Sequence, residues 1–155
     1  MNIGEVLAPI LARLPRERQP LLIAAAERLA AERYREWATQ VPRADVQTGL
    51  RACADREEEI ARRIEGLYPS ASTVQREILA ANPDLLEVNR ALFAGRTLDE
   101  QFRIQADGER LGAATWRSFA KHAETPAARD TLLACARLEE ESAAFLESLL
   151  AGAVR

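Results

Sequence analysis

Residues 50–67 read LRACADREEEIARRIEGL, and residues 132–149 read LLACARLEEESAAFLESL. The two stretches lie 82 positions apart and place Glu57 opposite Glu139 when they are aligned. In each, apolar residues and that glutamate recur at intervals of three and four, which is the spacing of one face of an α-helix. Both stretches are therefore predicted to be long helices that direct a glutamate towards the same interior.

The same offset extends the likeness towards the N-terminus. Residues 24–38, AAAERLAAERYREWA, align with residues 106–120, ADGERLGAATWRSFA, and Glu27 falls on Glu109. We interpret the chain as an internal repeat of two helix pairs, in which every long helix carries one interior glutamate. The repeat units cover residues 20–67 and 102–149.

The remaining segments connect and extend these pairs. No segment alternates with the period of two that a strand needs, so the predicted class is all-α. Short links within each pair force antiparallel hairpins, while the crossover between the pairs is long enough to travel the length of a bundle. One domain is expected over 1–155. Its first elements are a short amphipathic helix at 3–14 and helices at 20–40 and 44–67. A crossover at 68–96 follows, with two short helices split at Asn82-Pro83, where Asn82 is expected to cap the second helix and Pro83 to open it. The last two long helices run from the capping box Thr97–Glu100 to about 123 and from Thr125-Pro126 to Gly152.

Composition excludes several functions. The 155-residue chain has a net charge of -3 with arginines dispersed among glutamates, which argues against nucleic-acid binding. No apolar run approaches the roughly 20 residues that span a bilayer. The first residues lack a basic region and include Glu5, so no secretory signal is expected. Cys53 and Cys135 fit small buried hydrophobes in a reducing compartment, and we predict a cytoplasmic protein.

Four carboxylates that converge in a helical core cannot all stay charged and unpaired. No lysine or arginine lies on the interior faces of the four long helices. Bound cations, arginines from neighbouring helices, protonation or admitted water are the available ways to compensate the charge. Tyr34 and Trp116 lie at equivalent positions two turns after the interior glutamates of their helices and are expected to pack in the core. The hydroxyl of Tyr34 could also donate to a carboxylate.

This pattern resembles the rubrerythrin-type, ferritin-like family of carboxylate-bridged di-iron bundles. That family has a glutamate on its first and third helices and Glu-x-x-His on its second and fourth. The resemblance implies a ferritin-like four-helix bundle of two hairpins joined by a long crossover. It also makes four glutamates the candidate metal ligands: Glu27, Glu57, Glu109 and Glu139.

Both histidine positions of the family pattern are replaced, by Ile60 and by Ser142. The single histidine, His122, lies about four turns from Glu109 and cannot substitute for them. Imidazole ligands suit iron, whereas an all-carboxylate set suits harder cations such as Mn²⁺, Mg²⁺ or Ca²⁺. We therefore expect a degenerate di-metal site with a candidate divalent cation, Fe, Mn or another, and no assigned catalytic residue.

The favoured function is a structural or binding role without di-iron catalysis. Two alternatives stay open: a metal-dependent oxidase or peroxidase with substitute ligands, and a module that binds a small molecule or a partner helix. No nucleic-acid or membrane partner is expected. The apolar N-terminal helix and the crossover helices leave a homodimer contact open.

Overall fold

The computed structural model describes residues 1–152, and within them it is all-helical, as predicted. The last three residues of the predicted 1–155 domain lie outside this description. The elements are α1 (Ile3–Leu11), a 3-10 turn (Arg16–Arg18), α2 (Gln19–Gln40), α3 (Ala44–Glu65), α4 (Ala71–Ala81), α5 (Leu85–Phe93), α6 (Leu98–Ala120) and α7 (Pro126–Gly152).

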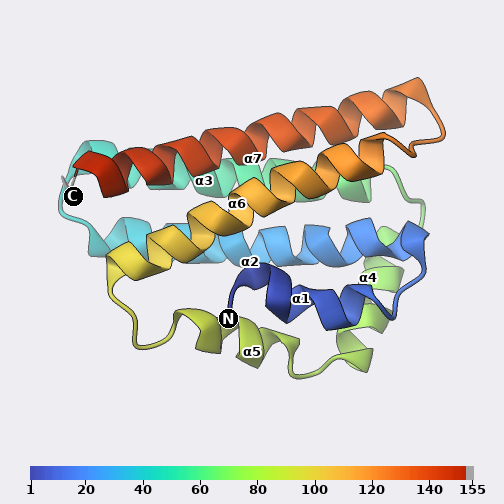
Figure 1. Cartoon of the computed structure of the whole chain (residues 1–155), viewed down its shortest axis with the longest axis horizontal. Coiled ribbons are helices and arrows are strands. Elements are labelled where there is room, and N and C mark those ends of the chain that lie inside the picture. Colours follow the sequence, from blue (N-terminus) through green and yellow to red (C-terminus); the bar gives the residue numbers. More distant parts are fainter. Residues whose placement is uncertain (153–155) are drawn as a thin grey trace.

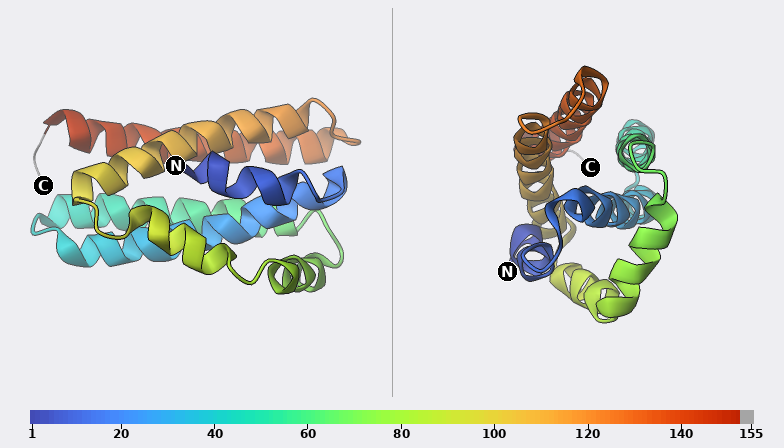
Figure 2. Two further views of the ribbon diagram at one scale, coloured as in Figure 1. Left: turned by 60° about the horizontal axis from the view of Figure 1, so that its bottom comes forward. Right: turned by 90° about the vertical axis from the view of Figure 1, so that its right-hand side faces the viewer.

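The four long helices lie side by side as a bundle (Figure 1). Helices α2 and α3 form one antiparallel hairpin, α6 and α7 form the other, and α3 packs against α7 to join them. Helix α4 crosses one end of the bundle, where it contacts α2, and α5 returns along the outside of the bundle (Figure 2). Helix α1 packs on α6 and α5 at the edge of the bundle.

Local sequence explains where the second hairpin begins. At the start of α6, Thr97 and Glu100 form the predicted capping box, in which each side chain accepts a hydrogen bond from the backbone of the other. Helix α7 begins at Pro126, and the hydroxyl of Thr125 accepts from the backbone N–H of Ala128. These caps place the starts of α6 and α7 where the sequence predicts them.

Three helices end two or three residues before their predicted ends. The observed last residues are Leu11, Glu65 and Ala120, instead of residues 14, 67 and 123. In each case the following residues turn with i to i+3 hydrogen bonds, for example from Leu14 N to Leu11 O at 3.1 Å. Such tightened last turns are common at helix ends and are invisible to apolar spacing.

The prediction for Asn82-Pro83 was wrong, because Asn82 ends the first crossover helix and does not begin the second. We expected Asn82 to cap the N-terminus of the second crossover helix and Pro83 to open that helix. Instead, Asn82 closes α4, and its side-chain amide donates to Ile78 O at 2.8 Å. Helix α5 begins only at Leu85, after Asp84, so Pro83 lies in the turn. The short polar side chain was satisfied by the preceding helix before the next one began.

The core consists of two apolar clusters. One contains Tyr34, Trp37 and Phe102, and the other contains Ile60 and Trp116. On each long helix the interior glutamate lies where the chain passes from one cluster to the other, so a carboxylate layer divides the core. The flanking pairs are Ile23 and Ala31, Cys53 and Ile60, Ala106 and Ala113, and Ala136 and Leu146. Within residues 1–152, every helix is too short or too polar to cross a bilayer.

Candidate functional site

All four predicted glutamates are buried in this layer. Glu57, Glu109 and Glu139 are 0%, 1% and 1% exposed, and Glu27 is 8% exposed. They come from α3, α6, α7 and α2, one from each long helix. The 82-residue offset therefore identified four interior acids.

Three of these glutamates form a cluster with the geometry of a cation site. One carboxylate oxygen from each of Glu27, Glu57 and Glu139 lies within 4.8 Å of the others. Three carboxylate ligands at this spacing are a donor set suited to a hard divalent cation. Glu109 is outside this group but close enough to act electrostatically on Glu27 and Glu57.

Neutral donors hold Glu109 and Glu139 in place. The hydroxyl of Tyr34 donates to Glu109 Oε1 at 2.6 Å, and Gln105 Nε2 donates to the same oxygen at 2.7 Å. On the other side, Trp116 Nε1 donates to Glu139 Oε1 at 2.7 Å. Both residues were expected to pack in the core; a hydrogen bond from Tyr34 was allowed by the sequence, and the bond from Trp116 was not foreseen.

Glu57 is the least satisfied of the four. Ser142 Oγ donates to its Oε1 at 3.2 Å, but its Oε2 is buried without a hydrogen-bond partner. Ser142 itself accepts from Arg56 Nε at 3.0 Å. Ile60, at the other replaced histidine position, is fully buried. An unpartnered buried carboxylate oxygen is rare and indicates a missing proton, water or ion.

Basic side chains do not neutralise the layer. Among residues 1–152, no lysine or arginine forms an ion pair with any of the four glutamates. Arg33 instead donates to Gln105 and Asn89, and Arg56 donates to Ser142 and to Cys53 Sγ. No arginine among these residues pairs directly with the layer, although the nearby charge of Arg33 lowers the pKa of Glu27 without an ion pair.

The pKa values show the consequence. Burial, followed by repulsion from Glu109, raises the pKa of Glu27 to about 7. Burial and neighbouring carboxylates raise the pKa values of Glu57 and Glu139 well above their usual range. At neutral pH the layer thus holds protons unless a cation takes their place.

A glycine makes room for one carboxylate. A Cβ atom on Gly112 would lie 2.6 Å from Glu139 Oε1 and 2.8 Å from its Cδ. Any larger residue at this position of α6 would displace a buried, hydrogen-bonded carboxylate. Gly112 is therefore part of the site.

The histidine and the two cysteines lie outside the carboxylate layer. His122 is exposed just beyond α6, and Cys53 and Cys135 are free and buried in different clusters. The i to i+4 spacing of Glu58 and Arg62 on α3 would allow an ion pair between them. Instead, Glu58 pairs with two arginines of α2, and Arg62 pairs with Glu59.

We expect Tyr34→Phe to lower the free energy of unfolding by about 1–2 kcal/mol, since Glu109 loses a buried hydrogen bond. Urea unfolding followed by circular dichroism measures this. Tyr68→Phe is the matched control, because Tyr68 is half-buried and its hydroxyl has no hydrogen bond to a described residue. Equal effects of the two substitutions would show that the bond from Tyr34 contributes no stability.

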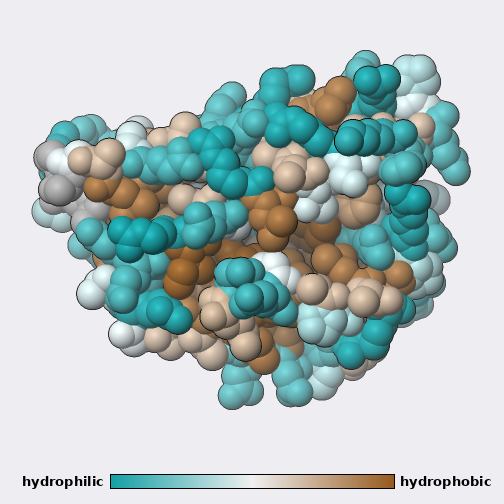
Figure 3. Space-filling view, in the orientation of Figure 1, coloured by the Kyte–Doolittle hydropathy of each residue, from teal (hydrophilic) through white to brown (hydrophobic). Residues whose placement is uncertain are grey.

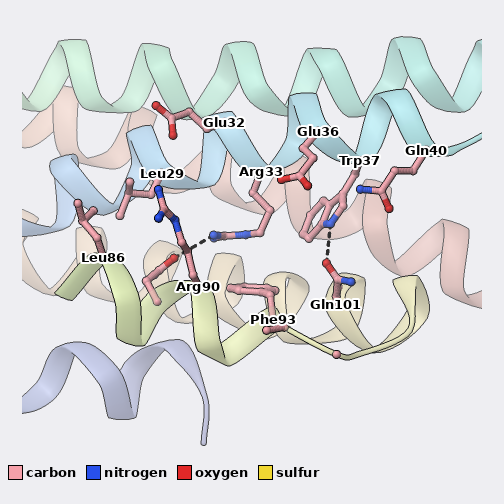
Figure 4. A pocket seen from close by; sticks show the side chains of 13 residues that line it. Leu29, Glu32, Arg33, Glu36, Trp37, Gln40, Leu86, Arg90, Phe93 and Gln101 are labelled. Carbon is pink, nitrogen blue, oxygen red and sulfur yellow. Dashed lines mark hydrogen bonds between the residues drawn. The ribbon is translucent and has the colours of Figure 1, made fainter. Parts of the chain in front are cut away.

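A pocket of about 400 Å³ lies apart from the carboxylate layer, between α2 and α5. Arg33 and Trp37 point from α2 towards α5 and the start of α6, and Trp37 Nε1 donates to Gln101 at 2.8 Å (Figure 4). The guanidinium carbon of Arg33 lies 3.8 Å from the centroid of the Phe93 ring, and none of the four glutamates lines this pocket.

Comparison with protein-family models, characterised proteins and solved structures finds no match to this chain.

Proposed function

We propose that this chain is a ferritin-like bundle with a degenerate di-metal site, which binds a single hard divalent cation such as Mn²⁺. Its role would be structural or binding, without di-iron catalysis. The observation that carries the proposal is the cluster of three buried carboxylates, one of which, Glu57, has an oxygen with no hydrogen-bond donor.

Charge balance supports a cation. Three carboxylates within a few ångströms repel one another, and their burial removes the water that would screen them. No guanidinium or ammonium group pairs with them within residues 1–152, and the charge of Arg33 acts on Glu27 and Glu57 only without direct contact. Protons or a bound cation are therefore needed to offset the remaining charge. A divalent ion would neutralise two carboxylates at once and give Glu57 Oε2 a partner.

The residues do not fit a symmetrical di-iron centre. Ile60 presents an aliphatic side chain where the family pattern has an imidazole, and Ser142 Oγ is already hydrogen-bonded to Arg56 and Glu57. An oxidase or peroxidase would need substitute ligands, and Ile60 supplies none. The remaining all-oxygen set suits Mn²⁺, Mg²⁺ or Ca²⁺ better than iron.

The arrangement of helices supports the ferritin-like part of the proposal. Two antiparallel hairpins are joined by a long crossover that contains α4 and α5, and each long helix contributes one glutamate to a shared layer. Two buried free cysteines are in keeping with a reducing, cytoplasmic compartment.

The test is thermal unfolding with and without Mn²⁺ after treatment with a chelator. At an Mn²⁺ concentration 100 times its Kd, binding to the folded state adds about 2.7 kcal/mol. For a domain of this size that raises Tm by about 5–10 °C. Glu57→Gln should abolish the rise, because an amide cannot supply the missing anionic ligand.

Glu140→Gln is the control, since Glu140 is an α7 glutamate next to the site that pairs with Arg117 at the surface. It should keep the full Mn²⁺ effect. An equal rise in the Glu57→Gln variant would place the ion elsewhere. No rise with Mn²⁺, Mg²⁺ or Ca²⁺ would mean that protons alone neutralise the layer.

A further inference from the structure

A second cavity, of about 80 Å³, lies between α1, α2 and α6 and reaches the carboxylate layer from one side. Its walls are mostly apolar, and Leu111, which is 47% exposed, marks its outer side. In the space-filling view, hydrophobic residues gather along the line where α1 meets α6 (Figure 3). The apolar lining is Ile3, Leu7, Leu11, Ile23, Ala26 and Ala30.

Two acidic side chains, Glu27 and Glu109, also line this cavity. Within the described residues, no amide, guanidinium or hydroxyl group donates a hydrogen bond to Glu27, whose carboxyl group contacts those of Glu57 and Glu139. Both side-chain donors to Glu109 bond to Oε1. The cavity therefore combines an apolar wall with two buried carboxylates that have unused acceptor capacity.

One basic group, Arg33, lies at the wall formed with Gln105 and Asn89. Its guanidinium donates to both of these neutral side chains and stacks on Phe93. Its hydrogen bonds are thus directed away from Glu27 and Glu109. Arg33 lines the cavity at this end, and its charge acts on Glu27 and Glu109 without a direct ion pair.

We propose that this cavity binds a small primary alkylammonium ion. The ammonium group donates to Glu27 and Glu109, and the alkyl chain lies against Leu7 and Leu11. A hydrated metal ion would leave the apolar wall in contact with its water shell, and a neutral apolar molecule would leave the carboxylates uncompensated. An anion would be repelled by both.

The size of the cavity limits the ligand. A water molecule needs about 10–15 Å³ of cavity volume. A cavity of about 80 Å³ therefore accepts roughly five non-hydrogen atoms. Butylammonium has five. The amine is protonated at neutral pH, as is the lysine side chain, whose pKa is about 10.4.

This inference goes beyond the proposed Mn²⁺ site. The two sites share Glu27, but the amine uses Glu109, whereas the metal uses Glu57 and Glu139. We therefore expect butylammonium and Mn²⁺ to compete in the unmodified protein. The two proposals can fail separately, because the amine is titrated in chelator, where no metal is bound, and the metal is tested by thermal unfolding without amine.

The experiment is calorimetric titration of the full chain with butylammonium chloride in the presence of a chelator. Butan-1-ol, which has the same chain and no charge, is the matched probe. We expect butylammonium to bind at least ten times more tightly than butan-1-ol. Equal affinities would overturn the proposal, since the carboxylates would then play no part.

Variants locate the binding. Glu109→Gln should weaken butylammonium at least ten-fold, whereas Glu140→Gln, at the surface, should leave its affinity within about two-fold. Ala26→Leu should block the cavity, and Ala114→Leu, on the exposed face of α6, is its control. Unchanged affinity in Ala26→Leu or in Glu109→Gln would overturn the proposal.

A measurement on the unmodified protein makes the test independent of whether the variants fold. Nuclear Overhauser effects should connect the methylene protons of butylammonium with the methyl groups of Leu7 and Leu11. Their absence at saturating ligand would exclude the cavity as the binding site. Nuclear Overhauser effects to methyl groups far from α1 would also exclude the cavity as the binding site.

Discussion

Replacement of Ile60 and Ser142 together by histidine is expected to give a protein that binds two metal ions per chain. Both positions are buried, three residues after Glu57 and Glu139 respectively, so each new imidazole would lie on the same helix face as its glutamate. Such Glu-x-x-His pairs complete the donor set of carboxylate-bridged di-metal bundles. Anaerobic loading with Fe²⁺, followed by elemental analysis after desalting, measures the stoichiometry.

The expected gain in affinity is large. Substitution of residues that only support metal ligands changes affinity by 10–100-fold, so two new direct ligands should tighten binding by at least ~100-fold. Ser142→His also removes the acceptor of Arg56 Nε. Arg56 is then expected to pair with Glu141, whose Oε2 is already 4.0 Å from Arg56 Nη1.

Ile60→Leu/Ser142→Ala is the control, because it changes the same positions without adding a ligand. It should bind at most one ion, as the unmodified chain does under our proposal. A folded histidine double variant that binds no more metal than this control would mean that the four carboxylates are not placed as in a ferritin-like di-metal centre. The resemblance would then concern the helix pattern alone.

The interior position of the four glutamates was predictable because it depends only on helix periodicity. A residue spaced three and four positions from apolar neighbours lies on the face that the helix buries, whatever partner covers it. Glu57 and Glu139 follow this rule at the centres of their stretches. The start of α6 was predictable for a similarly local reason, since Thr97 and Glu100 form a capping box within four residues.

The partners of those glutamates were not predictable, because they come from other helices. Trp116 reaches Glu139 of α7, and Arg56 of α3 reaches Ser142 of α7. Such pairs depend on helix crossing, register and side-chain rotamers, none of which is encoded in spacing along one helix. The roles of Ser142 as a bridge between Arg56 and Glu57 and of Gly112 as space for Glu139 emerge only from the three-dimensional structure.

The N-terminal helix illustrates the same limit. Its amphipathic pattern predicted a buried face, and residues such as Leu7 are indeed buried. The pattern did not indicate which helices it would cover. Its position over α6, beside Glu27 and Glu109, creates the cavity for which we propose an amine ligand.

In the presence of a chelator, the protein is expected to lose stability steeply between pH 5 and pH 8. Burial raises the pKa of Glu27 from 4.5 to about 7 and raises the pKa values of Glu57 and Glu139 well above 4.5. The folded chain therefore keeps protons that the unfolded chain releases. This contribution to stability is full below pH 4.5 and is lost as the pH rises through the folded-state pKa values.

The magnitude follows from the shift. Each pKa unit corresponds to 1.36 kcal/mol, so Glu27 alone accounts for about 3 kcal/mol of lost stability, and Glu57 and Glu139 add to it. Urea unfolding in chelator at intervals across this pH range measures the slope. Saturating Mn²⁺ should reverse the trend above pH 7, because metal binding requires the deprotonated carboxylates.

Glu57→Gln/Glu139→Gln should reduce the slope and make the chelated protein more stable than the unmodified chain at pH 8, since two buried groups can no longer ionise. The same variant should gain nothing from Mn²⁺. Glu140→Gln, at the surface, should keep the slope of the unmodified chain. If the chelated, unmodified protein is equally stable from pH 5 to pH 8, the four acids cannot share a dry core, because their ionisation would then leave folding unaffected.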